Sequence, residues 1–157
     1  MKYCLSAFIL SAALTPAYAG SVVDGAGVWT GTVSADVHQI SEGHMIIHTN
    51  NAYEAATMSD PNNPMAGMSG PCFGSVEVKG TSASGTGNCV FRAGRNAMTV
   101  QWTATGFAAS GALIGHWSIT GGAGDLANAT GGGTFYSLTD QAAGTFENTL
   151  KGAMSLN

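Results

Sequence analysis

Apolar residues in this chain alternate with polar ones in short runs, and glycine or polar turn residues separate the runs. Residues 97–105 show the pattern most clearly, with Met98, Val100, Trp102 and Ala104 on one side and three threonines and a glutamine on the other. A period of two is the signature of a β-strand with one buried face, and a threonine-rich face is typical of strands that face solvent. No window after residue 20 sustains the i, i+3, i+4, i+7 pattern of an amphipathic helix. The sequence therefore predicts an all-β protein.

The alternating runs predict about eight or nine strands joined by hairpins. They lie at residues 28–34, within 37–49, and at 52–58, 72–80, 87–92, 97–105, 113–120, 133–138 and 144–154. We expect turns at Asn50-Asn51 and at residues 81–85, and a loop at residues 59–71. Closing a sheet on itself removes its exposed edges. The prediction is a single domain over residues 20–157 that forms an antiparallel up-and-down β-barrel of about eight strands, with a two-sheet β-sandwich as the alternative.

The first residues have the layout of a secretory signal peptide. Lys2 precedes an apolar run at residues 5–14, and a Pro16 helix breaker is followed by the small-x-small pattern of Ala17 and Ala19. We expect cleavage after Ala19 and export of a mature chain to the periplasm or the medium. An N-terminal anchor helix is the alternative, although the apolar run is short for a membrane span.

The mature chain would keep Cys72 and Cys89, since Cys4 leaves with the signal peptide. An exported chain with an even number of cysteines favours a disulfide. The two cysteines fall near the open end of the hairpin predicted over residues 72–92. A metal or redox pair would need closer spacing or nearby histidines. The sequence thus predicts one disulfide that joins two neighbouring strands.

Charge is sparse and predominantly negative. Only 9% of the residues are charged, against about 25% in a typical globular protein. After residue 20, four basic residues stand against nine acidic ones. Nucleic acids and anionic membrane surfaces require clustered Lys and Arg, so we expect neither partner. We also expect no stable membrane insertion and no cofactor.

A glycine-rich segment spans residues 119–133, between two predicted strands. Its Gly122-x-Gly124-x-x-Ala127 stretch formally matches a relaxed dinucleotide-binding pattern, which requires a helix immediately afterwards. Three consecutive glycines at 131–133 instead break any helix at about 1 kcal/mol each. We therefore interpret the segment as a tight connection in a barrel, with Leu126 as an apolar plug beneath it.

This segment, with Phe135 after it and Gly115-His116-Trp117 before it, resembles the glycine-rich segment of the allene oxide cyclase and dirigent barrel superfamily. Ala123 and Leu126 stand where that family usually has Thr or Ser and an aromatic residue. The resemblance implies an eight-stranded antiparallel barrel with an apolar cavity. It also implies either cyclisation of a reactive intermediate or orientation of a substrate without catalysis.

Acid–base candidates are few. His44 and His48 share one face of a strand, His38 has the same parity, and His116 lies on another strand. Among the carboxylates on predicted strands, Glu54 and Glu77 would become candidate acids if they faced inward, because burial raises the pKa of a carboxyl group. The weak catalytic candidates are Glu54, Glu77, His44 and His116, with exposed strand side chains as the simpler interpretation.

Two side-chain sets have other interpretations. Met58, Met65 and Met68 lie close in sequence to His44 and His48, and thioether and imidazole groups suit copper. Apolar plugs are the simpler role for methionines in a loop, and we expect no metal site. Trp102, Trp117 and Phe135 are the candidate cavity residues, because a barrel of this size holds side chains or one small ligand.

The sequence predicts an exported small β-barrel that binds or orients a small apolar molecule without catalysis. A cofactor-free cyclase or isomerase of the allene oxide cyclase type is the first alternative. A structural or copper-binding extracytoplasmic accessory protein is the second. Homo-oligomer formation stays open.

Overall fold

The computed structural model describes residues 20–156. The predicted signal peptide, residues 1–19, lies outside the described residues, and so does its cleavage site on the N-terminal side of Gly20. In the part of the chain that is described, no helix has the length and hydrophobicity needed to cross a membrane.

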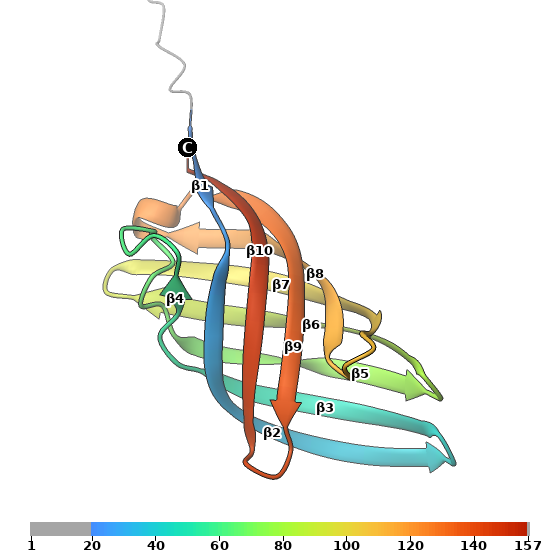
Figure 1. The fold of residues 1–157 in the computed structure, drawn as a ribbon. Helices are drawn as coiled ribbons and strands as arrows, with labels where there is room; N and C mark the ends of the chain where they lie inside the picture. Colours follow the sequence, from blue (N-terminus) through green and yellow to red (C-terminus); the bar gives the residue numbers. More distant parts are fainter. Residues whose placement is uncertain (1–19, 157) are drawn as a thin grey trace, which may run out of the picture.

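Eight antiparallel strands form a closed ring (Figure 1). In ring order they are β2 (Gly27–Ser41), β3 (His44–Tyr53), β5 (Gly70–Lys79), β6 (Ser82–Ala93), β7 (Asn96–Phe107), β8 (Leu113–Ala123), β9 (Thr130–Asp140) and β10 (Thr145–Leu156). The ring closes where β10 pairs with β2, from Thr145↔Thr32 to Leu150↔Gly27. The predicted antiparallel barrel is confirmed, and each strand pairs with its neighbours in chain order as an up-and-down barrel requires.

Two short strands lie beside the ring. β1 (Ser21–Asp24) pairs with the end of β10, and β4 (Thr57–Met58) pairs with the start of β2. The short strand β1 was not predicted from the sequence. Beyond Thr32 β2 leaves its partner β10 and continues with β3 alone to the hairpin at its end.

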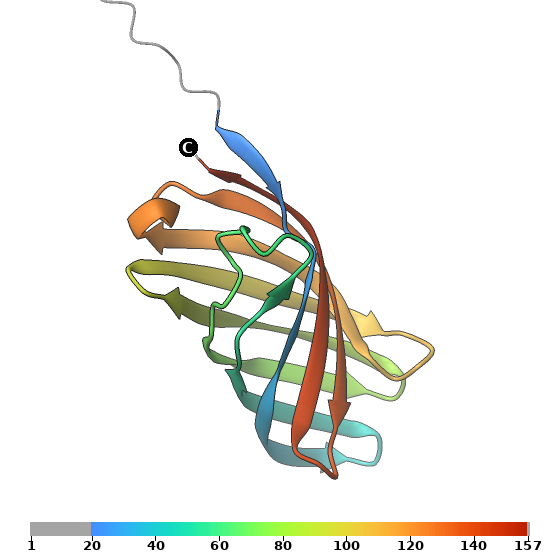
Figure 2. The ribbon, with the colours of Figure 1, turned by 60° about the vertical axis from the view of Figure 1, so that its left-hand side comes forward.

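The two ends of the barrel differ. The connections β2–β3, β5–β6, β7–β8 and β9–β10 lie at one end, which we call the mouth. The connection between β3 and β5, drawn in green in Figure 2, lies at the other end together with the short 3-10 helix η1 (Gly124–Leu126). Met65 from that connection and Leu126 from η1 are fully buried with Met98 and Met154. These apolar side chains close the end opposite the mouth.

The predicted alternation along β7 is confirmed. Met98 and Val100 are buried while Gln101 and Thr103 are exposed. Cross-strand hydroxyl contacts tie the outer face to β8, with Thr120 Oγ1 donating to Thr99 Oγ1 at 3.1 Å. One face of β7 therefore belongs to the interior and the other to the surface.

The turn between β2 and β3 is at Glu42-Gly43, and the turn predicted at Asn50-Asn51 is wrong. Gly43 has a φ of +68°, the left-handed region that glycine adopts without steric cost. Asn50 and Asn51 instead lie inside β3, where they pair with Phe73 and Cys72 of β5. The hairpin is consequently longer than predicted, and Tyr53 belongs to β3.

The glycine segment is a connection of the barrel, as the sequence predicts. It turns through η1 between β8 and β9, and Leu126 is completely buried beneath it. Gly131, Gly132 and Gly133 pair in β9 with Met154, Ala153 and Gly152 of β10. Arg95 from the β6–β7 turn forms an ion pair with Asp125 at 2.6 Å. Hydrogen bonds from this guanidinium and, to a smaller extent, from the amide of Asn96 hold the pKa of Asp125 below its usual range. The segment is thus docked onto the neighbouring turn.

The predicted disulfide between Cys72 and Cys89 is confirmed. The two cysteines are direct cross-strand partners in β5 and β6 and are both buried. The bond therefore joins two adjacent walls of the barrel from the inside.

Candidate functional site

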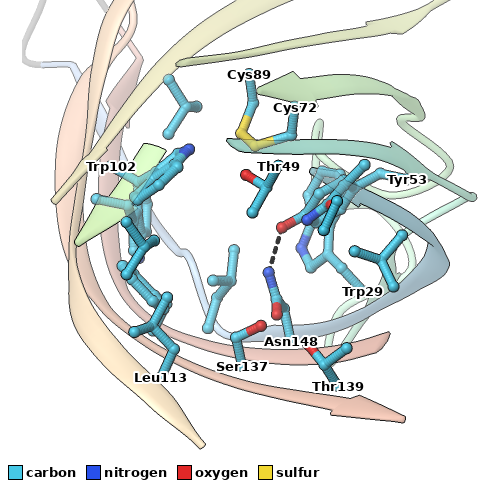
Figure 3. A pocket seen from close by; sticks show the side chains of 18 of the residues that line it. Trp29, Thr49, Tyr53, Cys72, Cys89, Trp102, Leu113, Ser137, Thr139 and Asn148 are labelled. Atoms are coloured by element: carbon cyan, nitrogen blue, oxygen red, sulfur yellow. Dashed lines mark hydrogen bonds between the residues drawn. A yellow bond between two sulfur atoms is a disulfide. The ribbon is translucent and has the colours of Figure 1, made fainter. Parts of the chain in front are cut away.

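A cavity of about 380 Å³ occupies the barrel interior (Figure 3). Its walls come from all eight strands of the ring, and Met65 contributes to its lining from the closed end. Near the mouth the lining reaches the exposed residues Gly111 and Gln141. The barrel is therefore hollow, and its hollow is accessible from the mouth.

All three predicted cavity aromatics line this cavity: Trp102, Trp117 and Phe135. The rings of Trp102 and Phe135 meet edge to face, with their centroids 6.4 Å apart. The indole of Trp117 donates its Nε1–H to the carbonyl of Lys151 at 3.2 Å, which fixes its orientation. Their contact with a ligand stays a prediction.

A second aromatic group forms the opposite wall. Trp29 packs against Phe91 at a centroid distance of 4.4 Å, and Tyr53 contacts Phe146 at 4.5 Å. Figure 3 shows Trp29 and Tyr53 across the cavity from Trp102. The hollow is thus bounded by aromatic rings on two sides.

Glycines make room for the ring of Trp102. Gly74 and Gly87 are cross-strand partners in β5 and β6. A Cβ at Gly74 would lie 2.3 Å from the indole of Trp102, and one at Gly87 would lie 2.4 Å from it. The indole of Trp102 therefore occupies the space that side chains at these two positions would need.

The cavity wall carries no formal charge. Within residues 20–156, no Asp, Glu, Lys, Arg or His lines it. Apart from the disulfide-bonded cysteines, Tyr53 is the one ionisable side chain among the described residues that line the cavity. Burial raises the pKa of Tyr53 well above its ordinary value. At neutral pH the interior is electrically neutral.

Polar side chains of β9 and β10 interrupt the apolar wall. Asn148, only 7% exposed, donates its Nδ2–H to the hydroxyl of Tyr53, as the dashed line in Figure 3 shows. Ser137 and Thr139 of the neighbouring β9 also line the cavity. The sequence signal for Asn148 was a single polar residue at an inward position between Phe146 and Leu150.

Three buried polar atoms in this region have no partner among the described residues: Trp29 Nε1, Asn51 Oδ1 and Asn148 Oδ1. All three residues line the cavity. Buried polar groups in folded proteins are nearly always hydrogen-bonded. The unpaired atoms therefore mark the part of the wall with capacity for a polar ligand group.

The candidates His44 and Glu77 lie together, but outside the barrel. Successive side chains of a strand point to opposite faces, and the buried Val76 and Val78 place Glu77 outward. Glu77 contacts Lys79 at 2.8 Å and His44 at 2.9 Å. A hydrogen bond from Lys79, the largest contribution, and a second one from His44 hold the pKa of Glu77 below its usual value. This is a surface ion cluster with no access to the cavity.

The other two candidates are also remote from the cavity lining. Glu54 follows β3 at the closed end, is exposed, and accepts a 3.5 Å hydrogen bond from Thr30 Oγ1. His116 is exposed next to the inward Trp117. The structure thus brings none of the four acid–base candidates into the interior.

The methionine and histidine sets differ in burial. Met58, Met65 and Met68 are buried in the core, whereas His48 is exposed on the outer face of β3, where its ring lies 5.3 Å from that of His38. Across the described residues, no three His, Cys, Asp or Glu side chains gather in a metal-binding arrangement. These positions give no support to the copper interpretation.

Comparisons with known proteins identify the architecture. No protein-family description matches the sequence, and no curated protein matches it. Among solved structures, a pterocarpan synthase dirigent protein superposes with a TM-score of 0.53 and 10% sequence identity, over 96% of this chain and 99% of that one. At this identity the likeness concerns the fold alone, and the chain has a dirigent-like β-barrel fold.

Proposed function

We propose that this protein is an exported barrel that binds, and thereby orients, one small neutral apolar molecule without catalysing its conversion. The observation that carries the proposal is the hollow interior, with its aromatic walls and uncharged lining. Small-molecule sites are concave and mostly apolar, with a few polar groups that fix orientation. A cavity of about 380 Å³ falls within the usual range of such sites, about 300–1,000 Å³.

The dirigent-like fold supports a role in binding or orientation. The fold neighbour is called a pterocarpan synthase. The alternative function is therefore that of a cofactor-free cyclase or isomerase. Such an enzyme needs a general acid or base within hydrogen-bonding reach of its substrate. Tyr53 is the titratable side chain in the lining, and its raised pKa leaves it protonated at neutral pH. The interior therefore favours binding over proton transfer.

Filling the cavity tests this function. Thr49 lines the cavity, and His48 next to it points to the outer surface. Thr49→Trp should lower the affinity for the neutral fluorescent probe N-phenyl-1-naphthylamine by at least about tenfold, because the indole would occupy the hollow. His48→Trp adds the same group outside and should leave the affinity unchanged. Fluorescence titration measures both.

Ser137→Phe, which fills the hollow from β9, repeats the test independently, and circular dichroism verifies that each variant is folded. Equal probe affinity in the wild type and in folded cavity-filling variants would place the binding elsewhere. Absence of any probe binding to the wild type would contradict a ligand-binding role for the interior.

Export rests on the sequence pattern of residues 1–19 and is supported by the disulfide, since such bonds persist in oxidising compartments. When the full chain is produced in a Gram-negative host, we expect the periplasmic fraction to contain a chain that begins at Gly20 with Cys72 and Cys89 oxidised. Intact-mass spectrometry measures both features. Ala17→Arg should block processing, whereas recovery of the full-length chain from the wild type would refute the cleavage.

A further inference from the structure

We infer that Tyr53 and Asn148 form a head-group site that selects ligands with a hydroxyl group over otherwise identical molecules that lack one. The inference rests on the proposed ligand-binding function of the cavity. It begins from Asn148, which is 7% exposed and whose Oδ1 has no partner among the described residues although its Nδ2 is bonded.

The hydrogen-bond geometry leaves a donor on Tyr53 and an acceptor on Asn148 side by side. Because Asn148 Nδ2 donates to the oxygen of Tyr53, the phenolic proton of Tyr53 remains to be donated elsewhere. Asn148 Oδ1 remains as an acceptor. If the amide were turned over, Tyr53 would donate to Asn148 Oδ1, and the pair would still offer an acceptor, the oxygen of Tyr53, and donors, the N–H groups of Asn148 Nδ2. The complementary character of the pair therefore does not depend on the amide orientation.

A hydroxyl group matches this pair because it donates one hydrogen bond and accepts others. An ether can only accept, and a hydrocarbon can do neither. A carboxylate could accept from Tyr53, but its charge would be buried in a lining that has no Lys, Arg or His within residues 20–156. The site therefore discriminates by hydrogen bonding within a class of neutral molecules and rejects anions by desolvation.

The opposite wall determines how such a ligand would lie. Trp102 and Leu113 face Tyr53 and Trp29 across the hollow in Figure 3, and Trp102 packs with Phe135. The carbon skeleton of the ligand would contact Trp102 while its hydroxyl meets Tyr53 and Asn148. Asn51, whose Oδ1 is also unpartnered in the described structure, supplies a second acceptor on the polar side. The cavity thus has a polar side and an apolar side, which orients an amphiphilic guest.

A matched probe series tests the inference. Naphthalene-2-methanol, 2-methylnaphthalene and 2-naphthoate share one ring system and differ in the polar end. For the wild type we expect the alcohol to bind about tenfold more tightly than the hydrocarbon, which corresponds to about 1.4 kcal/mol, and the carboxylate to bind more weakly than both. Tryptophan fluorescence titration gives the three dissociation constants.

The paired variant Tyr53→Phe/Asn148→Leu removes donor and acceptor together and so leaves no new unpaired group of this pair. It should bind 2-methylnaphthalene at least as tightly as the wild type and lose the preference for the alcohol. Asn50→Leu, an exposed neighbour on the outer face of β3, should preserve that preference. Near-ultraviolet circular dichroism and the melting temperature verify folding, and Asn148→Leu alone provides the second variant if the double substitution does not fold.

The outcomes separate the two proposals. If no probe of the series binds the wild type, the ligand-binding function itself fails. If the alcohol and the hydrocarbon bind the wild type equally, or if the alcohol preference survives in the double variant, the head-group site is wrong while the cavity function stands.

Discussion

Replacing both Cys72 and Cys89 by alanine should lower the free energy of unfolding by about 3 kcal/mol. The bond closes a loop with a sequence separation of 17 residues, and cross-linking a loop of about this length stabilises a protein by about 3 kcal/mol through the entropy of the unfolded chain. Alanine keeps both sites apolar, which matters because both cysteines are buried. For a domain of this size the loss corresponds to a fall in melting temperature of roughly 10 °C.

Urea unfolding of the oxidised wild type, the reduced wild type and the double variant measures the effect. The reduced wild type should resemble the variant, and the variant should not respond to reductant. A wild-type transition that is the same with and without reductant, under conditions that mass spectrometry shows to cleave the bond, would contradict the expected stabilisation.

Substituting Gly87 by alanine should both destabilise the barrel and reduce its cavity. The new Cβ would lie 2.1 Å from the carbonyl oxygen of Phe73 and 2.4 Å from the ring of Trp102. Overpacking of this kind costs typically about 1–3 kcal/mol. Since the carbonyl belongs to the neighbouring strand, the movable partner is the indole, and it can move only toward the hollow. We therefore expect weaker binding of N-phenyl-1-naphthylamine as well as a lower melting temperature.

Gly121→Ala is the matched control. Gly121 also lies in a strand, β8, but the nearest atom to its added Cβ is the side-chain oxygen of Thr99 at 3.1 Å. This variant should change stability by less than Gly87→Ala and leave probe binding intact. A crystal structure of Gly87→Ala with Trp102 in its original position and an unchanged cavity would rule out the spacer role of the glycine pair.

The barrel could be predicted from the sequence in strands whose alternating apolar residues are the ones that point into the interior. Along β7, Met98 and Val100 face the interior and the threonines face solvent, so the alternation revealed both the strand and its orientation. The inward Trp102, Trp117 and Phe135 were found for the same reason. Cys72 and Cys89 were paired correctly because a disulfide between adjacent strands needs only the correct hairpin.

The polar part of the candidate site was not predictable, because it depends on the position of one turn. Asn50 and Asn51 are frequent turn residues, yet here they continue β3, and the true turn uses Gly43. Misplacing the turn assigned Tyr53 to a separate return strand and hid its position beside Asn148, which lies 95 residues further along the chain.

The location of the acid–base candidates His44 and Glu77, inside or outside the barrel, depends on strand orientation. His44 and Glu77 belong to β3 and β5, and a shift of one residue in either strand would exchange its inner and outer faces. Only the observed register, with His44 opposite Lys79 and Glu77 opposite Ile46, places their cluster on the surface.

The pairing that closes the ring also sets a limit on when the protein can fold. Residues 27–32 at the start of the chain bond to residues 145–150 near its end, and β1 bonds to the last residues of β10. Contacts between such distant segments slow folding, because a long loop must be closed before they form. A growing chain that lacks its final strand has no seam, and its inward aromatic residues stay accessible to solvent. The barrel can therefore be completed only after β10 has been synthesised, and a stop codon placed before β10 would leave an open sheet instead of a slightly shortened barrel.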